Sequence, residues 1–259
     1  MSRASLRRIA AVAANTHRES VRERVLYNLV FFAILMMLSG LLLDELSVRQ
    51  DEKLVKDLGL AAMEIFGILI ALFIGVGLVS KELDKRSLYP LLAKPLRRWE
   101  LLLGKFIGLA LTLLVNIVVM TMAMLGTLSL TGRGFDPGLL VAVYTIFLSL
   151  LLIVAIALFF STLTSSTLAA VSTFCLVLAG RYADVIRNMS TVLPDAPRWL
   201  IDLVYYSIPN FSNFDLKDRV VYGDAVSVEE LLWITLYCGT YSGLALLLAF
   251  LGFRRRDLP

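Results

Sequence analysis

Side chains that could carry out catalytic or metal chemistry are scarce in this sequence. His17 is the only histidine, so neither a histidine-based metal site nor a Ser-His-Asp triad can be assembled within the chain. The tripeptide Gly104-Lys105-Phe106 lacks the upstream glycine and the hydroxyl residue of a phosphate-binding loop, and no Gly-x-Ser-x-Gly elbow occurs. We therefore expect no catalytic residue and no metal site in this chain.

Two polar side chains stand out within long apolar runs, where charged and polar groups are costly. Glu64 is one turn from the outer end of its run. It either faces an outward cavity, or it snorkels to the surface or pairs with a cation such as Arg181. Asn116 has Thr112 and Thr121 on neighbouring turns. It either lines a path or makes an interhelical hydrogen bond worth about 0.6 kcal/mol. Glu64 and Asn116 are accordingly the candidate substrate-path residues.

Composition places these residues in a lipid bilayer. The chain has 259 residues, 58% of them hydrophobic and 18% charged, with a mean hydropathy of +0.79, which is too apolar for one soluble core. Hydropathy predicts an all-α integral membrane protein in which residues 25–259 form one six-helix transmembrane domain. Each span is near the roughly 20 residues that cross the hydrocarbon, and the six lie at about 25–43, 60–79, 105–130, 138–160, 166–181 and 231–253.

The distribution of Lys and Arg predicts the orientation of these spans. Six of them lie in residues 1–24, seven in 80–105 and three in 254–256, all on one side, and cationic loops of this kind stay in the cytoplasm. We therefore predict that both termini are cytoplasmic. The cations cluster beside apolar runs, so the net charge of +4 reflects membrane topology, and we expect no nucleic-acid partner.

Residues 1–24 are predicted to form an interfacial amphipathic helix that rests on membrane lipids. Leu6, Ile9, Ala10 and Ala13 recur at helical spacing beside several arginines. The alternative is a disordered basic arm.

Two segments are predicted to lie on the outer side. Residues 44–59 carry both signs of charge and are typical of an exposed connection, whereas 181–230 combines prolines, aromatic residues and scattered charges. The second segment is too small for a core of its own, so we expect an outer cap of short amphipathic elements that could contact an extracytoplasmic partner protein. Small residues at four-residue spacing also predict close helix contacts, at Gly67, Ala71 and Gly75, at Gly104 and Gly108, and at Gly239 and Gly243.

The basic segment 80–104 joins the second and third predicted spans. Glu82, Leu83, Arg86 and the leucine-rich stretch 88–92 can form a short helix with an apolar side, which Pro95 ends before the next helix starts near Trp99. The segment thus offers a structured, charged surface to a cytoplasmic partner.

This segment resembles the one between spans two and three of type-2 ABC transporter permeases. The resemblance is carried by Glu82, Arg86-Ser87, a leucine cluster, Lys94-Pro95, Arg98, Glu100 and Leu103-Gly104-Lys105, and it is closest to the subgroup linked to maturation of periplasmic copper enzymes. Pro90 departs from the family pattern, in which a helix-compatible apolar residue is usual, and could restart the helix in a new register.

The resemblance implies a permease in a bacterial or archaeal cytoplasmic membrane, paired with a second copy or a sister permease above two separate ATPase subunits that hold ATP and Mg²⁺. It implies that 80–104 is a coupling segment, of which Glu82 to Leu92 would sit in a cleft on the ATPase surface. Glu82, Asp84, Lys85 and Arg86 would pair across that interface, while Leu88, Leu91 and Leu92 would fill the pocket.

The function predicted on this basis is that of an exporter permease, which is not itself an enzyme and moves substrate when a separate ATPase hydrolyses ATP. The alternative is a non-transporting membrane scaffold or assembly subunit. An intramembrane enzyme lacks a catalytic constellation. The identity of the substrate, the direction of transport and the choice between homodimer and heterodimer stay open at the level of the sequence.

Overall fold

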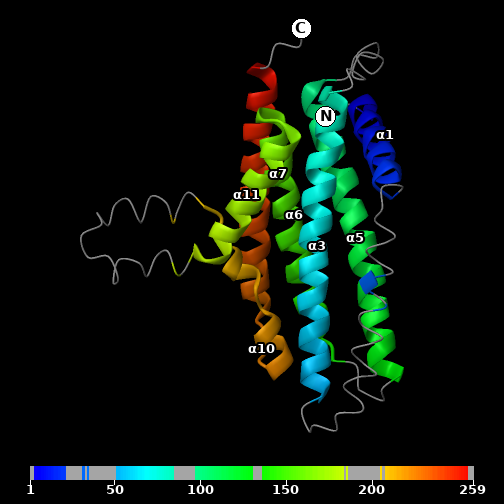
Figure 1. Cartoon of the computed structure of the whole chain (residues 1–259), viewed down its shortest axis with the longest axis vertical. Coiled ribbons are helices and arrows are strands. Elements are labelled where there is room, and N and C mark those ends of the chain that lie inside the picture. The colour runs from blue at the N-terminus through cyan, green and yellow to red at the C-terminus, as the bar shows by residue number, and fades with distance from the viewer. Residues whose placement is uncertain are drawn as a thin grey trace, which may run out of the picture.

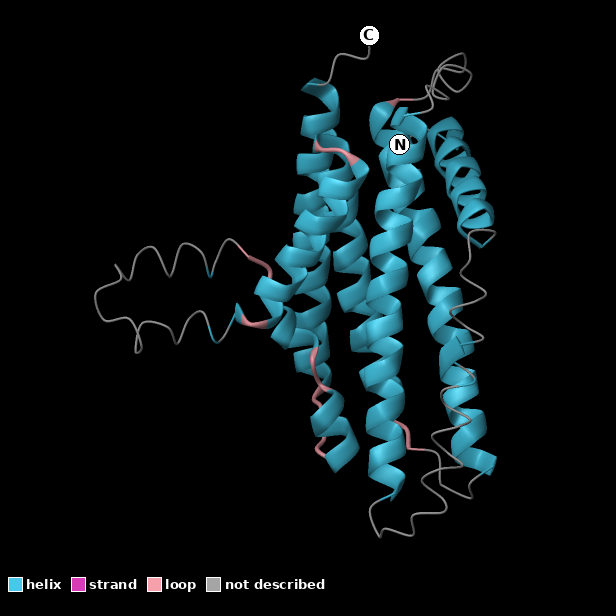
Figure 2. Cartoon of the chain, viewed as in Figure 1, coloured by secondary structure: helices cyan, strands magenta, loops and turns pink. Residues whose placement is uncertain are grey.

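The computed structural model describes residues 3–21, 31, 32, 34, 51–84, 97–130, 136–183, 185, 205 and 208–255. All regular structure in this part of the chain is helical (Figures 1 and 2). The elements are α1 (Arg3–Ser20), α3 (Asp51–Asp84), α5 (Arg98–Leu130), α6 (Gly138–Leu163), α7 (Ser166–Arg181), the 3₁₀ helix η2 (Phe211–Phe214), α10 (Lys217–Tyr222) and α11 (Val228–Arg255).

Four helices in the described residues are long and apolar enough to cross a membrane, and they correspond to the second, third, fourth and sixth predicted spans. They cover Val55–Gly77, Arg98–Leu130, Gly138–Leu163 and Val228–Arg254. The fifth predicted span is present as the shorter apolar helix α7. The first predicted span, 25–43, lies outside the described residues except for Phe31, Phe32 and Ile34.

The prediction of an exposed connection at 44–59 was wrong for its second half. Helix α3 begins at Asp51, and Val55 and Lys56 are buried. Lys56 bonds to Asp136 at 3.5 Å, and the Lys53 ammonium lies 4.9 Å from the centre of the Tyr222 ring. The charges of both signs that indicated a loop instead cover the end of a membrane helix.

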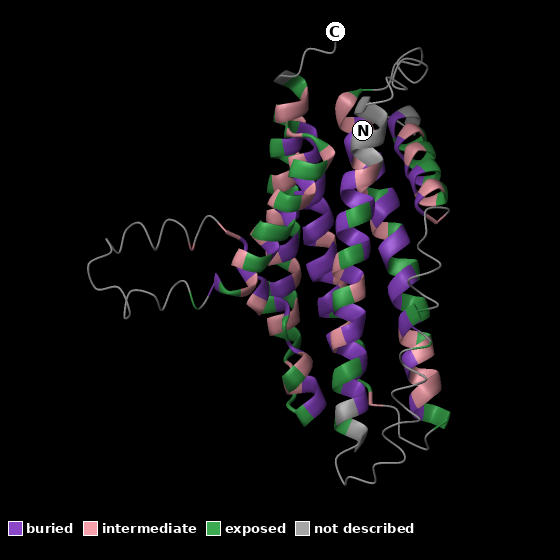
Figure 3. Cartoon of the chain, in the orientation of Figure 1, coloured by how far each residue is buried: buried purple, intermediate pink, exposed green. Residues whose placement is uncertain are grey.

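Helix α6 forms the centre of the bundle, with α3 and α11 packed along it and α5 and α7 beside it (Figures 1 and 3). Its middle residues are nearly all buried, which matches its uniformly apolar sequence. Gly67 and Gly75 of α3 face Leu150 and Ala157 of α6, where an added Cβ would lie 2.4 and 2.9 Å from the nearest side-chain atom. Two of the predicted small residues therefore bring α3 and α6 into close contact.

Helix α1 lies lengthwise along the first half of α5, near the end of the bundle where α3, α6 and α11 finish (Figure 1). We call this end the upper end, as drawn, and the other the lower end. Gly104 and Gly108 of α5 provide the contact surface, since a Cβ at Gly108 would lie 2.6 Å from the Ala13 carbonyl oxygen. The predicted apolar face of α1 is only half right. Its buried residues are Ser5, Ile9, Ala13, Thr16 and Ser20, whereas Leu6 and Ala10 are exposed.

Replacing Gly108 by leucine is expected to detach α1 from α5, because the new side chain would collide with backbone at Ala13 and with Thr16. Trypsin treatment of membranes should then cleave the α1 segment several-fold faster at Arg8 and Arg18. The matched control is Gly126→Leu on the same helix, where a Cβ meets nothing within 4 Å. Equal cleavage rates for the two variants would show that this contact does not hold α1.

Candidate functional site

A partly buried cluster of four charged residues, centred on the buried Glu64, joins three elements in the middle of the bundle. The Glu64 carboxylate of α3 contacts both Arg181, the last residue of α7, and Lys217, the first residue of α10. Asp215 lies 3.5 Å from the Lys217 ammonium and 3.8 Å from the Arg181 guanidinium. Only 9% of the Glu64 side chain and 14% of that of Lys217 are exposed. The pairing of Glu64 with Arg181 was one of the two readings of the sequence, and the structure confirms it.

Glu64 is deeper in its helix than the sequence indicated. The sequence analysis placed it one turn from the outer end, but the apolar span of α3 starts at Val55, about 14 Å before Glu64 along the helix axis. The error follows from the boundary at Asp51, because the charged residues before Gly59 were assigned to a loop. A carboxylate at this depth needs cations as partners, since an unpaired buried charge is strongly unfavourable.

Glycine and a short turn bring the second cation to Glu64. A Cβ at Gly180 would lie 2.3 Å from the Pro209 carbonyl oxygen, so only glycine allows the chain to pass across the last turn of α7. The Asn210 side chain then accepts a hydrogen bond from the Ser212 amide and starts η2. Phe211 and Phe214 are buried, and Lys217 follows at the start of α10.

The sequence offered no means of selecting Lys217. Four Lys or Arg residues lie between 182 and 230, and only the fold shows that residue 217 approaches residue 64. The stretch 208–227 of the predicted outer cap is also more deeply set than a cap on the outer face. It packs beside α3, α6 and α7, and α10 reaches the lower end of the bundle (Figure 1).

Asn116, the other candidate path residue, lies apart from this cluster. It is buried, and its Nδ2 donates to the Thr112 carbonyl within the same helix, rather than across helices as one reading expected. The Thr112 hydroxyl donates to the Gly108 carbonyl and lies 3.0 Å from His17 Nδ1 of α1. Asn116 Oδ1 has no hydrogen-bond partner among the described residues.

The first turn of α5 connects two helices at the upper end. Arg98 Nη1 donates to the Phe253 carbonyl at 2.9 Å and to that of Arg254 at 3.3 Å, and so satisfies carbonyls that the end of α11 leaves without an intrahelical partner. Glu100 accepts a hydrogen bond from the Arg97 amide and pairs with Arg8 of α1 at 3.6 Å. Movement of this turn would therefore act on both α1 and α11.

The predicted ATPase-coupling residues fall at the edge of the described structure. Glu82 and Asp84 are in the last turn of α3, which runs without a break from Asp51, so the helix does not start anew near Glu82. Lys85, Arg86, Leu88, Leu91 and Leu92 lie outside the described residues. The structure thus shows that the start of segment 80–104 continues the helix that carries Glu64.

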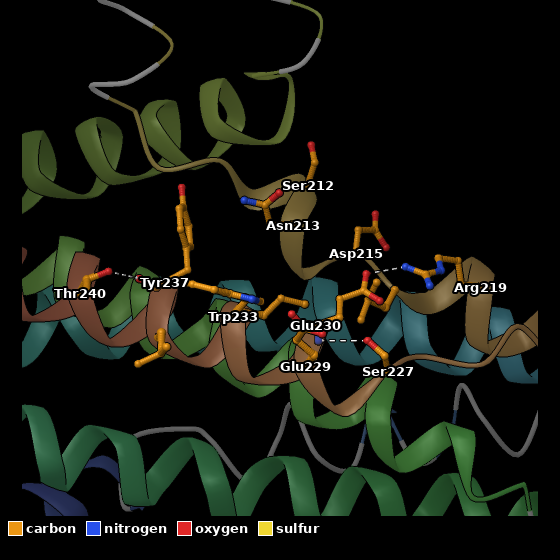
Figure 4. Close-up of a pocket in the computed structure, with 13 residues that line it drawn as sticks. Ser212, Asn213, Asp215, Arg219, Ser227, Glu229, Glu230, Trp233, Tyr237 and Thr240 are labelled. Atoms are coloured by element: carbon orange, nitrogen blue, oxygen red, sulfur yellow. Dashed lines mark hydrogen bonds and ion pairs between the residues drawn. The ribbon is translucent and has the colours of Figure 1, made fainter.

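A groove of about 860 Å³ opens between the η2–α10 segment and the lower half of α11 (Figure 4). Across it, Arg219 pairs with Glu230 at 2.6 Å, a hydrogen bond that raises the pKa of the guanidinium. Tyr237 points from α11 toward η2 and accepts a hydrogen bond from the Asn210 amide. The lining also includes Asp215 of the charge cluster, together with Trp233 and Ile234. No group of three or more His, Cys, Asp or Glu side chains able to hold a metal ion occurs within the described part of the chain.

The comparisons with known proteins identify the family. No curated protein matches the chain. The family model described as "ABC-2 family transporter protein" matches residues 10–183, a region that includes the second half of α1, the span with Glu64, segment 80–104 and α7. Since this match covers well over half of the 259 residues, the chain belongs to the ABC-2 transporter membrane family.

Proposed function

We propose that this chain is the permease subunit of an ATP-driven exporter and that it transmits ATP hydrolysis by a separate cytoplasmic ATPase to a movement of its spans. ABC-2 membership supports a membrane-spanning transporter subunit that works with an ABC ATPase in general. ATP and Mg²⁺ would bind to that partner. The export direction, the pairing with a second copy or sister permease, the cytoplasmic placement of both termini and the bacterial or archaeal inner membrane are parts of this proposal.

The observation that carries the proposal is the continuity of α3. This 34-residue helix begins at the lower end, passes the Glu64 cluster and ends at Asp84, inside the predicted coupling segment. From Glu64 to Asp84 is about 30 Å of unbroken helix. On the far side of that segment, the first turn of α5 is tied to α1 and α11 through Glu100 and Arg98. A partner that pushed on residues 85–97 would therefore act on three spans.

The orientation is supported by the charges at the upper end. The basic helix α1 lies there, as do the end of α3, which leads into the basic segment 80–104, and the end of α11, which carries Arg254 (Figure 1). A cytoplasmic upper end satisfies the positive-inside rule. It leaves η2, α10 and the groove on the outer half, where the predicted extracytoplasmic partner would bind.

The test is to purify the protein from its native membranes in mild detergent through a C-terminal tag, and to assay bound proteins and ATP hydrolysis. We expect an ABC ATPase to co-purify, and we expect the double charge reversal Glu82→Lys with Arg86→Glu to lower its recovery by about tenfold or more. The matched control is Lys53→Glu, a charge reversal at the opposite end of α3.

Two outcomes would count against the proposal. Recovery of the chain alone under several extraction conditions would favour the scaffold alternative, and equal ATPase recovery from the reversed and control variants would remove segment 80–104 as the coupling site. With the complex in hand, candidate cargoes can be screened by stimulated ATP hydrolysis. The resemblance to the copper-enzyme subgroup makes sulfur and copper species the first to try, before lipids, peptides and antibiotics.

A further inference from the structure

The four charges of the cluster divide into one carboxylate and one cation on the apolar helices, and one carboxylate and one cation on a short segment packed against them. Glu64 and Arg181 lie on the apolar helices α3 and α7, whereas Asp215 and Lys217 lie on the short segment 208–222. Each pair contains one carboxylate and one cation. If segment 208–222 moves away, Asp215 and Lys217 leave together at 3.5 Å, and Glu64 keeps Arg181. No unpaired charge is left buried on either side, so separation avoids the largest cost of breaking a buried salt bridge.

The segment 208–222 cannot be stable without these contacts. Helix α10 has only six residues and η2 four, which is too short for either to persist alone. The segment is held by buried apolar residues, including Phe211, Phe214 and Val221, and by the bonds from Lys217 to Glu64. Two further ion pairs involve the segment: Asp215 lies 3.8 Å from Arg181, and Arg219 pairs with Glu230, a contact that is exposed and contributes little.

We propose that Lys217, through Glu64, and Asp215, through Arg181, are positioning residues that hold segment 208–222 closed against the outer half of the bundle, and that movement of α3 releases it. The proposal rests on the permease function proposed above. It adds a transmission route, in which a push at the coupling segment shifts α3 along α6 and withdraws Glu64 from Lys217.

The test uses a cysteine reporter at Val221, which is 7% exposed in the closed arrangement. In the full chain within native membranes, Val221→Cys is combined with Cys175→Ser, because Cys175 is the exposed one of the two native cysteines. A membrane-impermeant maleimide is added from the outer side, and labelling is measured by mass spectrometry. The buried Cys238 remains as an internal monitor, because its labelling would report unfolding of the core.

We expect Lys217→Gln and Glu64→Gln to raise the labelling rate of residue 221 by about tenfold or more, because each removes a partner of a buried ion pair. Lys217→Arg, which keeps the cation, should label close to the unsubstituted rate. Arg219→Gln is the matched control, since it removes a cation two residues away whose pair is exposed. In the reporter protein whose four charged residues are unchanged, ATP with vanadate should raise the labelling rate of the cysteine at position 221.

The proposal is overturned if Lys217→Gln labels no faster than the parent, if Arg219→Gln labels equally fast, or if Cys238 is labelled together with residue 221. The last result would show that the cluster supports the whole fold rather than one segment. Labelling with ATP and vanadate separates the two proposals. If nucleotide raises labelling but Lys217→Gln does not, the ion pairs do not hold the segment, while the permease function stands. If Lys217→Gln raises labelling but nucleotide does not, the ion pairs hold the segment, but ATP hydrolysis does not release it.

Discussion

Replacement of Glu64 by leucine is expected to lower the free energy of unfolding by about 3–5 kcal/mol. The substitution removes the carboxylate that both Arg181 and Lys217 contact, and it leaves two cations with Asp215 as their shared partner at 3.8 and 3.5 Å. Leucine fills the space of Glu64 but offers no acceptor to either cation. The loss should appear as a lower unfolding temperature in detergent, measured as the temperature at which the monodisperse fraction on gel filtration falls.

The matched control for this prediction is Glu229→Leu, because Glu229 is an exposed carboxylate at the start of α11. Substitutions at exposed positions of this kind change the free energy of unfolding by only about 0.5 kcal/mol. The double variant Glu64→Leu with Lys217→Met restores charge balance, and we expect it to recover part of the loss. A Glu64→Leu protein as stable as the control would mean that the cluster is not a source of stability.

Replacement of Gly180 by leucine should destabilise the fold by about 3 kcal/mol or more, at the upper end of the range for overpacking. A Cβ here would lie 2.3 Å from the Pro209 carbonyl oxygen and 2.6 Å from the Phe211 ring. The first of these atoms is backbone and cannot rotate away, so η2 must shift and carry Lys217 with it. Thermal unfolding and the yield of folded protein after extraction measure the effect.

Gly239→Leu on α11 is the control for that substitution, because a Cβ there meets nothing within 4 Å in the described structure. It adds the same side chain to a glycine in another apolar helix and should be nearly neutral in the isolated subunit. If Gly180→Leu and Gly239→Leu unfold at the same temperature, the contact between α7 and the 209–211 backbone is not important for stability.

The sequence predicted the long helices well because an apolar run of membrane length has few other solutions. The bounds of α6 and α7 were predicted within a few residues at each end, and α5 begins near Trp99 as expected. The start of α3 was missed because charged residues at the end of a membrane helix resemble those of a loop. Here they are helical, with Lys56 reaching Asp136 and Lys53 covering Tyr222.

The buried face of α1 shows a second limit of hydrophobic patterning. In water the largest apolar residues mark the buried side of a helix, but where the surroundings include lipid this driving force is absent and close packing selects small residues. Ser5, Ala13 and Thr16 accordingly face α5, while Leu6 is 53% exposed. Hydrophobic spacing alone therefore predicted the helix but only part of its contact face.

The sequence predicted only one part of the candidate site, namely Glu64 and its need for a cation. A carboxylate at Glu64 requires cations, and the sequence analysis gave Arg181 as an example of such a partner. Lys217 and Asp215 could not be predicted as partners. They approach Glu64, about 150 positions away in the sequence, only because the chain at Pro209 packs closely against Gly180. Such long-range contacts depend on tertiary packing and have no local signal.

The pairing within the cluster has a consequence for the response to membrane voltage. A single elementary charge that crosses the whole membrane field does work of about 2.3 kcal/mol per 100 mV. Because Asp215 and Lys217 lie on one segment, 3.5 Å apart, the body that moves carries charges that cancel. The electric field thus does almost no net work on its displacement, and an energised membrane neither opens nor closes it.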